Sequence, residues 1–188
     1  MNTFLSREEV MALGFKSVGE NVLIGRTVMF YHPHLMEIGN NVRIDDFCTM
    51  SGKIILGSYI HISHFCSLYG GDSGIIMEDY TAISSKSSIY AVSDDYSGES
   101  MTNPMIPLEF RPHLVDKAVV FKKHAIVGAS SVVMPGVTLG EGCAVGSMSL
   151  VLKDLDAWTI NVGTPCKRMR PRSKNIINLE KDFAEKRK

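Results

Sequence analysis

The sequence lacks an excess of charge of either sign, since its 188 residues hold 20 lysines and arginines against 20 aspartates and glutamates. This balance argues against a nucleic-acid-binding protein, which usually carries a basic excess. The sequence also has no apolar run long enough to span a membrane, and its start, MNTFLSREEVMALGF, lacks the cationic region of a signal peptide. We therefore expect a cytoplasmic protein without a membrane partner.

Cysteine is scarce, and no two of the four cysteines form a CxxC pair. Pairs of this kind are typical of zinc sites and of thiol redox motifs. Cys48, Cys66 and Cys143 instead each follow a bulky apolar residue by four positions, where a free cysteine packs as a small apolar side chain. We therefore expect buried structural cysteines and no bound metal.

The sequence does contain a repeat of six residues. A period of six fits neither a simple strand nor an amphipathic helix, whose side-chain periods are 2.0 and 3.6. Three six-residue units close one triangular coil, and stacked coils pair backbone to backbone at roughly 4.8 Å. The repeat therefore predicts a β-helix with its bulky residues inside. In its most regular part these residues are Phe121, Val127, Val133, Leu139, Val145 and Val151.

The repeat divides the chain into three segments of one domain. The spacing is already present at the start of the range 18–151, which we predict as the β-helix. Residues 1–17 are expected to form a helical cap, because Ser6 and Glu9 make a capping-box pattern. Residues 152–188 are expected to form a C-terminal segment and a helix.

One long break interrupts the repeat. The register is lost between Ile89 and Phe121, and the intervening residues include three prolines. Prolines restrict the backbone and cannot donate to a strand ladder. We therefore predict a projecting loop over residues 93–117.

The C-terminal half carries a longer motif. It begins with VGASSVVMPGVTLG at Val127, continues through Gly146-Ser147 and Lys153-Asp154, and ends in Gly163-Thr164-Pro165-Cys166-Lys167. This motif resembles hexapeptide-repeat acyltransferases, and within them the galactoside and maltose O-acetyltransferases and their relatives in surface-polysaccharide synthesis. The resemblance implies a left-handed parallel β-helix, an exception to the right-handed crossover rule. It also implies a homotrimer that transfers an acetyl group from acetyl-CoA, bound between neighbouring prisms, to a hydroxyl or amine of a sugar or nucleotide-sugar.

Acyl transfer of this kind requires a base, and histidine is suited to the role near neutral pH. In the galactoside branch the catalytic histidine lies just beyond the coil equivalent to Ile83–Ile89, a position that holds Asp94 here. The stretch IHISHFC contains His61 and His64, and it resembles the histidine motif of UDP-N-acetylglucosamine acyltransferase and of sugar-nucleotide N-acetyltransferases. We predict His64 on a face of the prism and His61 at the preceding corner. Either histidine is a candidate base, with Asp94 as a supporting or catalytic group.

The remaining candidates contact the two substrates. The resemblance implies five residues for acetyl-CoA, two along the groove and three near its phosphates: Ala129, Ser147, Lys153, Lys167 and Arg170. Polar and aromatic residues in the glycine corner and at the start of the loop suit a sugar acceptor: Asp72, Asp95 and Tyr96.

Two other classes of protein remain open from the sequence. A γ-type carbonic anhydrase uses the same prism with histidine-bound zinc, and the chain has six histidines. A non-catalytic β-helix scaffold would explain why Asp94 occupies the expected histidine position. The sequence leaves open the identity of the acceptor and the choice between oxygen and nitrogen as the acylated atom.

Overall fold

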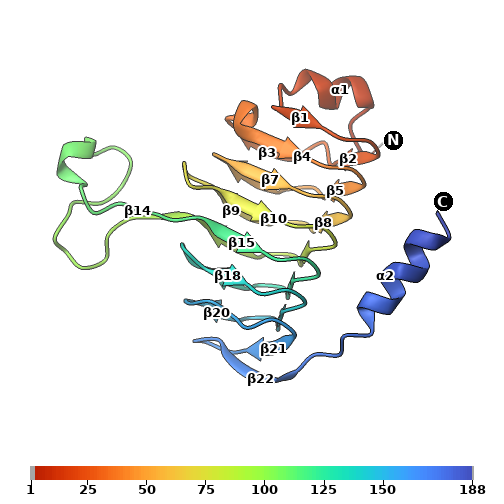
Figure 1. Cartoon of the computed structure of the whole chain (residues 1–188). Coiled ribbons are helices and arrows are strands. Elements are labelled where there is room, and N and C mark those ends of the chain that lie inside the picture. The colour runs from red at the N-terminus through yellow and green to blue at the C-terminus, as the bar shows by residue number, and fades with distance from the viewer. Residues whose placement is uncertain (1–2, 188) are drawn as a thin grey trace.

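The computed structural model describes residues 3–187, which wind into a three-sided prism of parallel strands (Figure 1). Each turn of the chain adds one short strand to each of three sheets. Sheet 1 contains β1 (Ser17–Val18), β4 (Met36–Ile38), β7 (Ile54–Leu56), β10 (Ile75–Met77), β15 (Val119–Phe121) and β18 (Thr138–Leu139). Sheet 2 contains β2 (Val22–Ile24), β5 (Val42–Ile44), β8 (Ile60–Ile62), β11 (Ala82–Ile83), β16 (Ile126–Val127), β19 (Ala144–Val145), β21 (Thr159–Val162) and β22 (Lys167–Pro171). Sheet 3 contains β3 (Met29–Tyr31), β6 (Thr49–Ser51), β9 (Ser67–Tyr69), β12 (Ser88–Tyr90), β17 (Val132–Val133) and β20 (Leu150–Val151).

The bulky repeat residues form the core of the prism. All six residues from Phe121 to Val151 are buried, and Phe121 stands in register between Met77 of β10 and Leu139 of β18. Cys48, Cys66 and Cys143 are buried and unpaired among these columns. The β-helix predicted from the six-residue period is confirmed.

Parallel stacking continues beyond residue 151. Strand β21 pairs in parallel with β19, and β22 then folds back antiparallel to β21. The prism therefore ends in a strand whose direction is reversed.

The N-terminal end is covered by α1 (Arg7–Ala12), which lies across the first coil (Figure 1). The Ser6 hydroxyl accepts a hydrogen bond from the main-chain N–H of Glu9, and the Glu9 carboxylate accepts one from the N–H of Ser6. The helix buries Val10 against the core. The predicted capping box is present, and it holds an apolar side chain over the open end of the prism.

The chain turns at three corners, which we name by what they carry. The helix corner joins sheet 1 to sheet 2, and residues 57–59, 78–81 and 122–125 belong to it. The histidine corner joins sheet 2 to sheet 3 and includes residues 45–48, 63–66, 84–87, 128–131 and 146–149. The loop corner joins sheet 3 to the next coil of sheet 1 and includes residues 32–35, 52–53, 70–74, 91–118 and 152–154.

The helix corner is occupied by α2 (Ile176–Glu185), which runs beside the prism (Figure 1). The rings of Tyr59 and Tyr80 stack 4.9 Å apart, and the Phe183 ring meets Tyr59 edge-on at 5.3 Å. The Glu180 carboxylate accepts hydrogen bonds from Lys123 and pairs with the buried His124 at 2.8 Å. Both apolar and charged contacts therefore hold this helix on its own chain.

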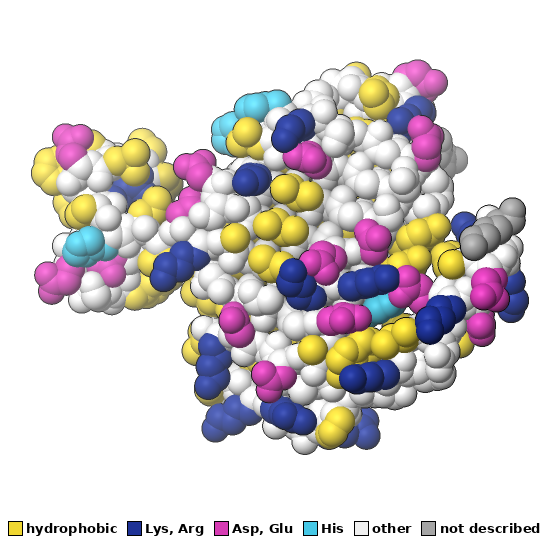
Figure 2. Space-filling view, in the orientation of Figure 1, with side chains coloured by type: hydrophobic (Ala, Val, Ile, Leu, Met, Phe, Trp, Pro, Cys, Tyr) yellow, Lys and Arg dark blue, Asp and Glu magenta, His cyan; other side chains and the backbone are white. Residues whose placement is uncertain are grey.

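The loop corner opens into a long excursion that contains the 3-10 turn η2 (Leu108–Phe110). A second 3-10 turn, η1 (Pro33–Leu35), lies at the same corner in the first coil, between β3 and β4. Strands β13 (Val92–Ser93) and β14 (Val115–Asp116) pair antiparallel and close the base of the excursion. Figure 2 shows apolar side chains gathered on this projecting loop, and they include Tyr96, Met101, Met105, Leu108 and Phe110.

Candidate active site

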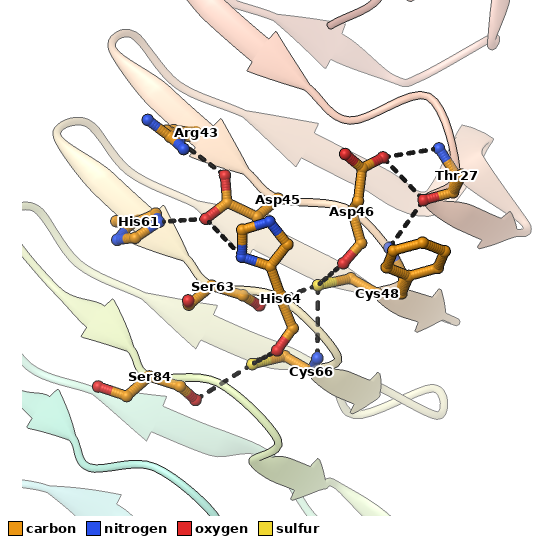
Figure 3. Close-up of polar contacts among 11 residues, drawn as sticks. Thr27, Arg43, Asp45, Asp46, Cys48, His61, Ser63, His64, Cys66 and Ser84 are labelled. Carbon is orange, nitrogen blue, oxygen red and sulfur yellow. Dashed lines mark hydrogen bonds and ion pairs between the residues drawn. The ribbon is translucent and has the colours of Figure 1, made fainter. Parts of the chain in front are cut away.

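A cluster of charged residues lies at the histidine corner, around the buried carboxylate of Asp45 (Figure 3). One carboxylate oxygen, Oδ2, lies 2.8 Å from Nε2 of His61 and 3.4 Å from Nδ1 of His64. The other oxygen accepts a 2.7 Å hydrogen bond from Nε of Arg43. The Asp45 side chain is 4% exposed, whereas the two imidazoles are each about half exposed. The buried Asp45 carboxylate thus contacts two histidines whose side chains are accessible to solvent.

Strand geometry explains how these residues meet. In β5 and β8 the apolar residues point inward, so the residue between them points outward, and Arg43 and His61 face out side by side in register. His64 lies in the turn that follows β8. The predicted placement was therefore wrong: His61 is on the face and His64 is at the corner, because the bulky Ile62 ends its strand.

The surroundings of Asp45 favour its ionised form. Burial opposes ionisation, but hydrogen bonds from His61 and Arg43 outweigh it and lower the pKa of Asp45 below its ordinary value of 3.8. With Nδ1 of His64 directed at this carboxylate, its Nε2 is left to accept a proton from outside. The cluster has the arrangement of a general base with a fixed orientation.

The Asp45→Asn variant tests the charge of this cluster. A folded-state pKa below the unfolded value means that ionised Asp45 stabilises the protein above pH 3.8, and that this contribution is lost as pH falls through the folded pKa. We expect Asp45→Asn to lower the free energy of unfolding by roughly 1.5–3 kcal/mol at pH 7. Urea denaturation of both proteins at pH 7 and pH 3 measures the difference. The difference in free energy of unfolding between the two proteins should shrink at pH 3. An equal difference at both pH values would contradict the stabilising role of ionised Asp45.

Further candidate residues lie on the same corner below His64. The strand register places Ser85, Ala129 and Ser147 on successive coils at the position that His64 occupies. Neighbouring coils are joined there by main-chain hydrogen bonds, since the N–H of Met148 donates to the carbonyl of Ala129 at 2.8 Å. The structure thus aligns the predicted base with the two residues predicted to line the acetyl-CoA groove.

The loop corner carries the predicted acceptor residues. Asp94 lies 3.7 Å from Arg111 and accepts a 3.2 Å hydrogen bond from the N–H of Asn103. Asp94 and Arg111 border a cavity of about 490 Å³ to which Tyr96 also contributes. Asp95 turns away into hydrogen bonds with Ser97.

Asp72 lines a second cavity at the loop corner, with a volume of about 340 Å³. Its main-chain N–H bonds to the Asp116 carboxylate at 2.9 Å, which fixes the glycine corner against the base of the loop. The acceptor candidates and the histidines therefore lie on different corners of one prism, and no hydrogen bond or ion pair joins them within residues 3–187.

Basic side chains gather at the C-terminal end of the prism (Figure 2). Lys153 and Lys167 border a cavity of about 380 Å³ together with Arg168 and the buried Cys166. Burial raises the pKa of the Cys166 thiol, so it stays protonated near neutral pH. Arg170 is exposed on β22 outside this cavity. Asp154 and Asp156 also line this cavity, so its three basic side chains exceed its acidic ones by one.

Within residues 3–187, no group of three or more histidine, cysteine or acidic side chains is arranged to hold a metal ion. No helix in this range is both long and apolar enough for a membrane crossing.

Comparison with known proteins gives the family. No protein-family model matches the chain. The dTDP-4-amino-4,6-dideoxy-D-glucose acyltransferase of Escherichia coli is 43% identical over 183 residues, which cover 96% of this chain and 94% of that protein. The chain belongs to the hexapeptide-repeat acyltransferases. It is therefore an enzyme of acyl transfer, and its resemblance to that superfamily is confirmed.

Solved structures agree with this acyltransferase along its whole length. The S84C variant of AntD, an N-acyltransferase from Bacillus cereus, superposes with a TM-score of 0.96 at 46% identity, covering 99% of both chains, in a complex with dTDP-4-amino-4,6-dideoxyglucose and coenzyme A. A hexapeptide-repeat acetyltransferase from Vibrio cholerae shares the fold at 18% identity and a TM-score of 0.59. Other AntD structures are of variants named S84A, S84T, D94A and D94N.

Sequence reasoning missed two features of this acyltransferase. Asp45 precedes Ser63 by one coil in the repeat, and that register is the signal that would have placed it beside the histidines. Tyr69 and Tyr90 stack 5.0 Å apart on sheet 3 and border the cavity beside Asp94. The two tyrosines pair in register on neighbouring strands, and this pairing can be recognised only once the coils are aligned.

Proposed function

We propose that the protein transfers an acyl group from acyl-CoA, with acetyl-CoA as the simplest donor, to the amino group of a dTDP-linked 4-amino-4,6-dideoxyhexose. The observation that carries this proposal is the nearly full-length match to the Escherichia coli enzyme and to AntD, which is known in complexes with the amino sugar nucleotide, with coenzyme A and with 3-hydroxybutyryl-CoA. We propose that the reaction takes place in the cytoplasm.

The chemistry follows the cluster at the histidine corner. The amine nitrogen attacks the thioester carbonyl, the new C–N bond forms, and the C–S bond breaks to release coenzyme A. The proton lost by the amine passes to Nε2 of His64 and then to the departing sulfur, which leaves as the thiol. In this proposal the Asp45 carboxylate orients His64, and His61 holds the same carboxylate in place through its 2.8 Å contact.

Ser84 and Asp94 are proposed to contact the acceptor or the reacting groups. This chain has serine and aspartate at the two numbers at which AntD was varied, and the two chains match over nearly their full lengths. Ser84 is exposed at the histidine corner, one coil below Ser63. Asp94 lies on the loop corner, so a role for both in one site requires two copies of the chain.

We therefore propose a homotrimer in which the loop corner of one copy packs on the histidine corner of the next. Lys153, Lys167 and Arg170 are proposed to bind the phosphates of coenzyme A, and Ala129 and Ser147 its pantetheine arm. Asp72, Asp95 and Tyr96 are proposed to contact the acceptor. The exposed apolar side chains on the loop support such an interface, since large apolar patches are typical of binding surfaces.

An assay of thiol release tests the function. The protein is incubated with acetyl-CoA or 3-hydroxybutyryl-CoA and either dTDP-4-amino-4,6-dideoxyglucose or dTDP-glucose, which has a hydroxyl at the same carbon. We expect turnover with the amino sugar and none above background with dTDP-glucose. Equal turnover with the two acceptors, or none with either, would overturn the proposal.

Mixing two impaired variants tests the shared site. Co-expressed His64→Ala and Asp94→Ala chains form mixed trimers in which about a quarter of the sites have both wild-type residues, if each site draws on two copies. We expect activity to return to about that fraction of wild type. Activity no higher than in either variant alone would place both residues in the site of one chain.

A further inference from the structure

The two cavities at the loop corner form one groove. Tyr69 and Val92 border both of them, so the cavities meet along the side of sheet 3. The groove crosses four successive coils, from His32 after β3 to Asp94 after β12. Three steps of about 4.8 Å give it a length of roughly 14 Å. This shape suits an elongated ligand with distinct ends.

The N-terminal end of the groove offers the polar groups that a pyrimidine ring requires. The Asp72 carboxylate is exposed and makes no hydrogen bond with residues 3–187, because the Asp116 contact uses only its main-chain N–H. The Ser51 hydroxyl and the His32 ring also line this end. Thymine presents one N–H donor between two carbonyl acceptors, which matches one carboxylate acceptor and two donors.

The walls and floor of this end suit a flat ring. Leu35, Val92 and the Tyr69 ring supply apolar surface. The floor includes Gly52, which is buried and packs closely on the next coil, since a Cβ added there would lie 2.6 Å from the carbonyl oxygen of Gly71. Both glycines have positive φ angles, which residues other than glycine rarely adopt. Glycine at both positions therefore leaves no side chain between this end of the groove and the main chain.

The other end has different chemistry. Asp94 is held by Arg111, whose Nε donates a 2.8 Å hydrogen bond to the carbonyl of Ile106 and whose side chain is only 12% exposed. A fixed carboxylate of this kind suits a sugar amino group, which is a hydrogen-bond donor in both protonation states.

We propose that this groove binds the acceptor lengthwise, with the pyrimidine ring at the His32–Asp72 end and the amino sugar at the Asp94 end. This inference rests on the proposed function, because it assumes a pyrimidine nucleotide-sugar as the acceptor. It assigns base recognition to Asp72, Ser51 and His32, which act at a distance from the acyl-transfer chemistry.

Calorimetry with dTDP, which lacks the amino hexose of the acceptor, separates the two ends. We expect Asp72→Ala to weaken dTDP binding by about 10-fold or more, since a hydrogen bond to a charged group is lost. The preference for dTDP over dCDP should fall at the same time, because cytosine lacks the ring N–H. Asp94→Asn should bind dTDP within about twofold of wild type, while its KM for the amino sugar nucleotide rises.

Two controls make the outcome decisive. Binding of coenzyme A to each variant shows that the prism is intact, and Ser51→Ala replaces Asp72→Ala if the latter does not fold. If wild type binds dTDP but Asp72→Ala binds it equally well with the same base preference, the groove assignment is wrong and the proposed function stands. If Asp94→Asn weakens dTDP binding and Asp72→Ala does not, the orientation is overturned. Absence of dTDP binding by wild type would overturn the proposed function and the groove together.

Discussion

Replacing His64 by alanine is expected to slow acyl transfer by about 10²–10⁴-fold, the usual contribution of a general base. The effect should fall on kcat, because the imidazole acts on the proton that leaves the amine and contributes little to ground-state binding. His61→Ala should cost less, since His61 lies on the face of the prism and supports the charge of Asp45. Steady-state kinetics with the amino sugar nucleotide and acetyl-CoA measures both variants.

The matched control for His64 is His34→Ala. His34 is also an exposed histidine, but it lies at the loop corner and borders neither cavity there. We expect it to keep the wild-type rate. All three variants should remain folded and of the same oligomeric state, because the altered side chains are exposed. If His64→Ala and His61→Ala both keep the wild-type rate, neither histidine is the base.

Truncation of Phe121 should have the largest effect on stability. Its side chain is fully buried and packs in the column between Met77 and Leu139, in the first coil after the loop. Phe→Ala at such a position costs about 3–5 kcal/mol, because burial is lost and a cavity remains. For a chain of this length the melting temperature should fall by about 6–20 °C.

Differential scanning calorimetry at a fixed protein concentration measures this loss, since oligomer stability depends on concentration. Lys122→Ala is the control, because Lys122 is the next residue and is exposed, and within residues 3–187 its side chain makes only a surface ion pair with Glu78. It should change the free energy of unfolding by less than about 1 kcal/mol. Similar losses in the two variants would mean that the core column does not carry the stability of this coil.

The fold was predictable because the repeat records a physical constraint at every coil. Each bulky position lies at the end of a strand or one residue before it and points inward, so a polar residue there would be buried without a partner. The same constraint says nothing about outward residues. The period alone therefore did not show that Ile62 ends its strand, and His61 and His64 were assigned to the wrong positions in the coil.

The site was less predictable because its residues come from separate coils and corners. Asp45 meets His61 through the stacking of β5 on β8, which depends on the register and on the left-handed backbone of Phe47 at the corner, where φ is 62°. The helix α2 was expected from its amphipathic pattern. Its position beside Tyr59 and Tyr80 was not, because the stack of rings forms only when the coils are aligned.

The reversed strand β22 also limits how molecules add to one another. A stack of parallel strands has an open hydrogen-bonding edge at each end, and such edges invite other molecules to join as further coils. Here the last edge belongs to an antiparallel strand whose exposed side chains include Lys167, Arg168 and Arg170. Another copy of this C-terminal end would bring like charge to this edge. Sheet 2 therefore disfavours end-to-end stacking of C-terminal ends, through the lysine and arginine side chains on its last strand.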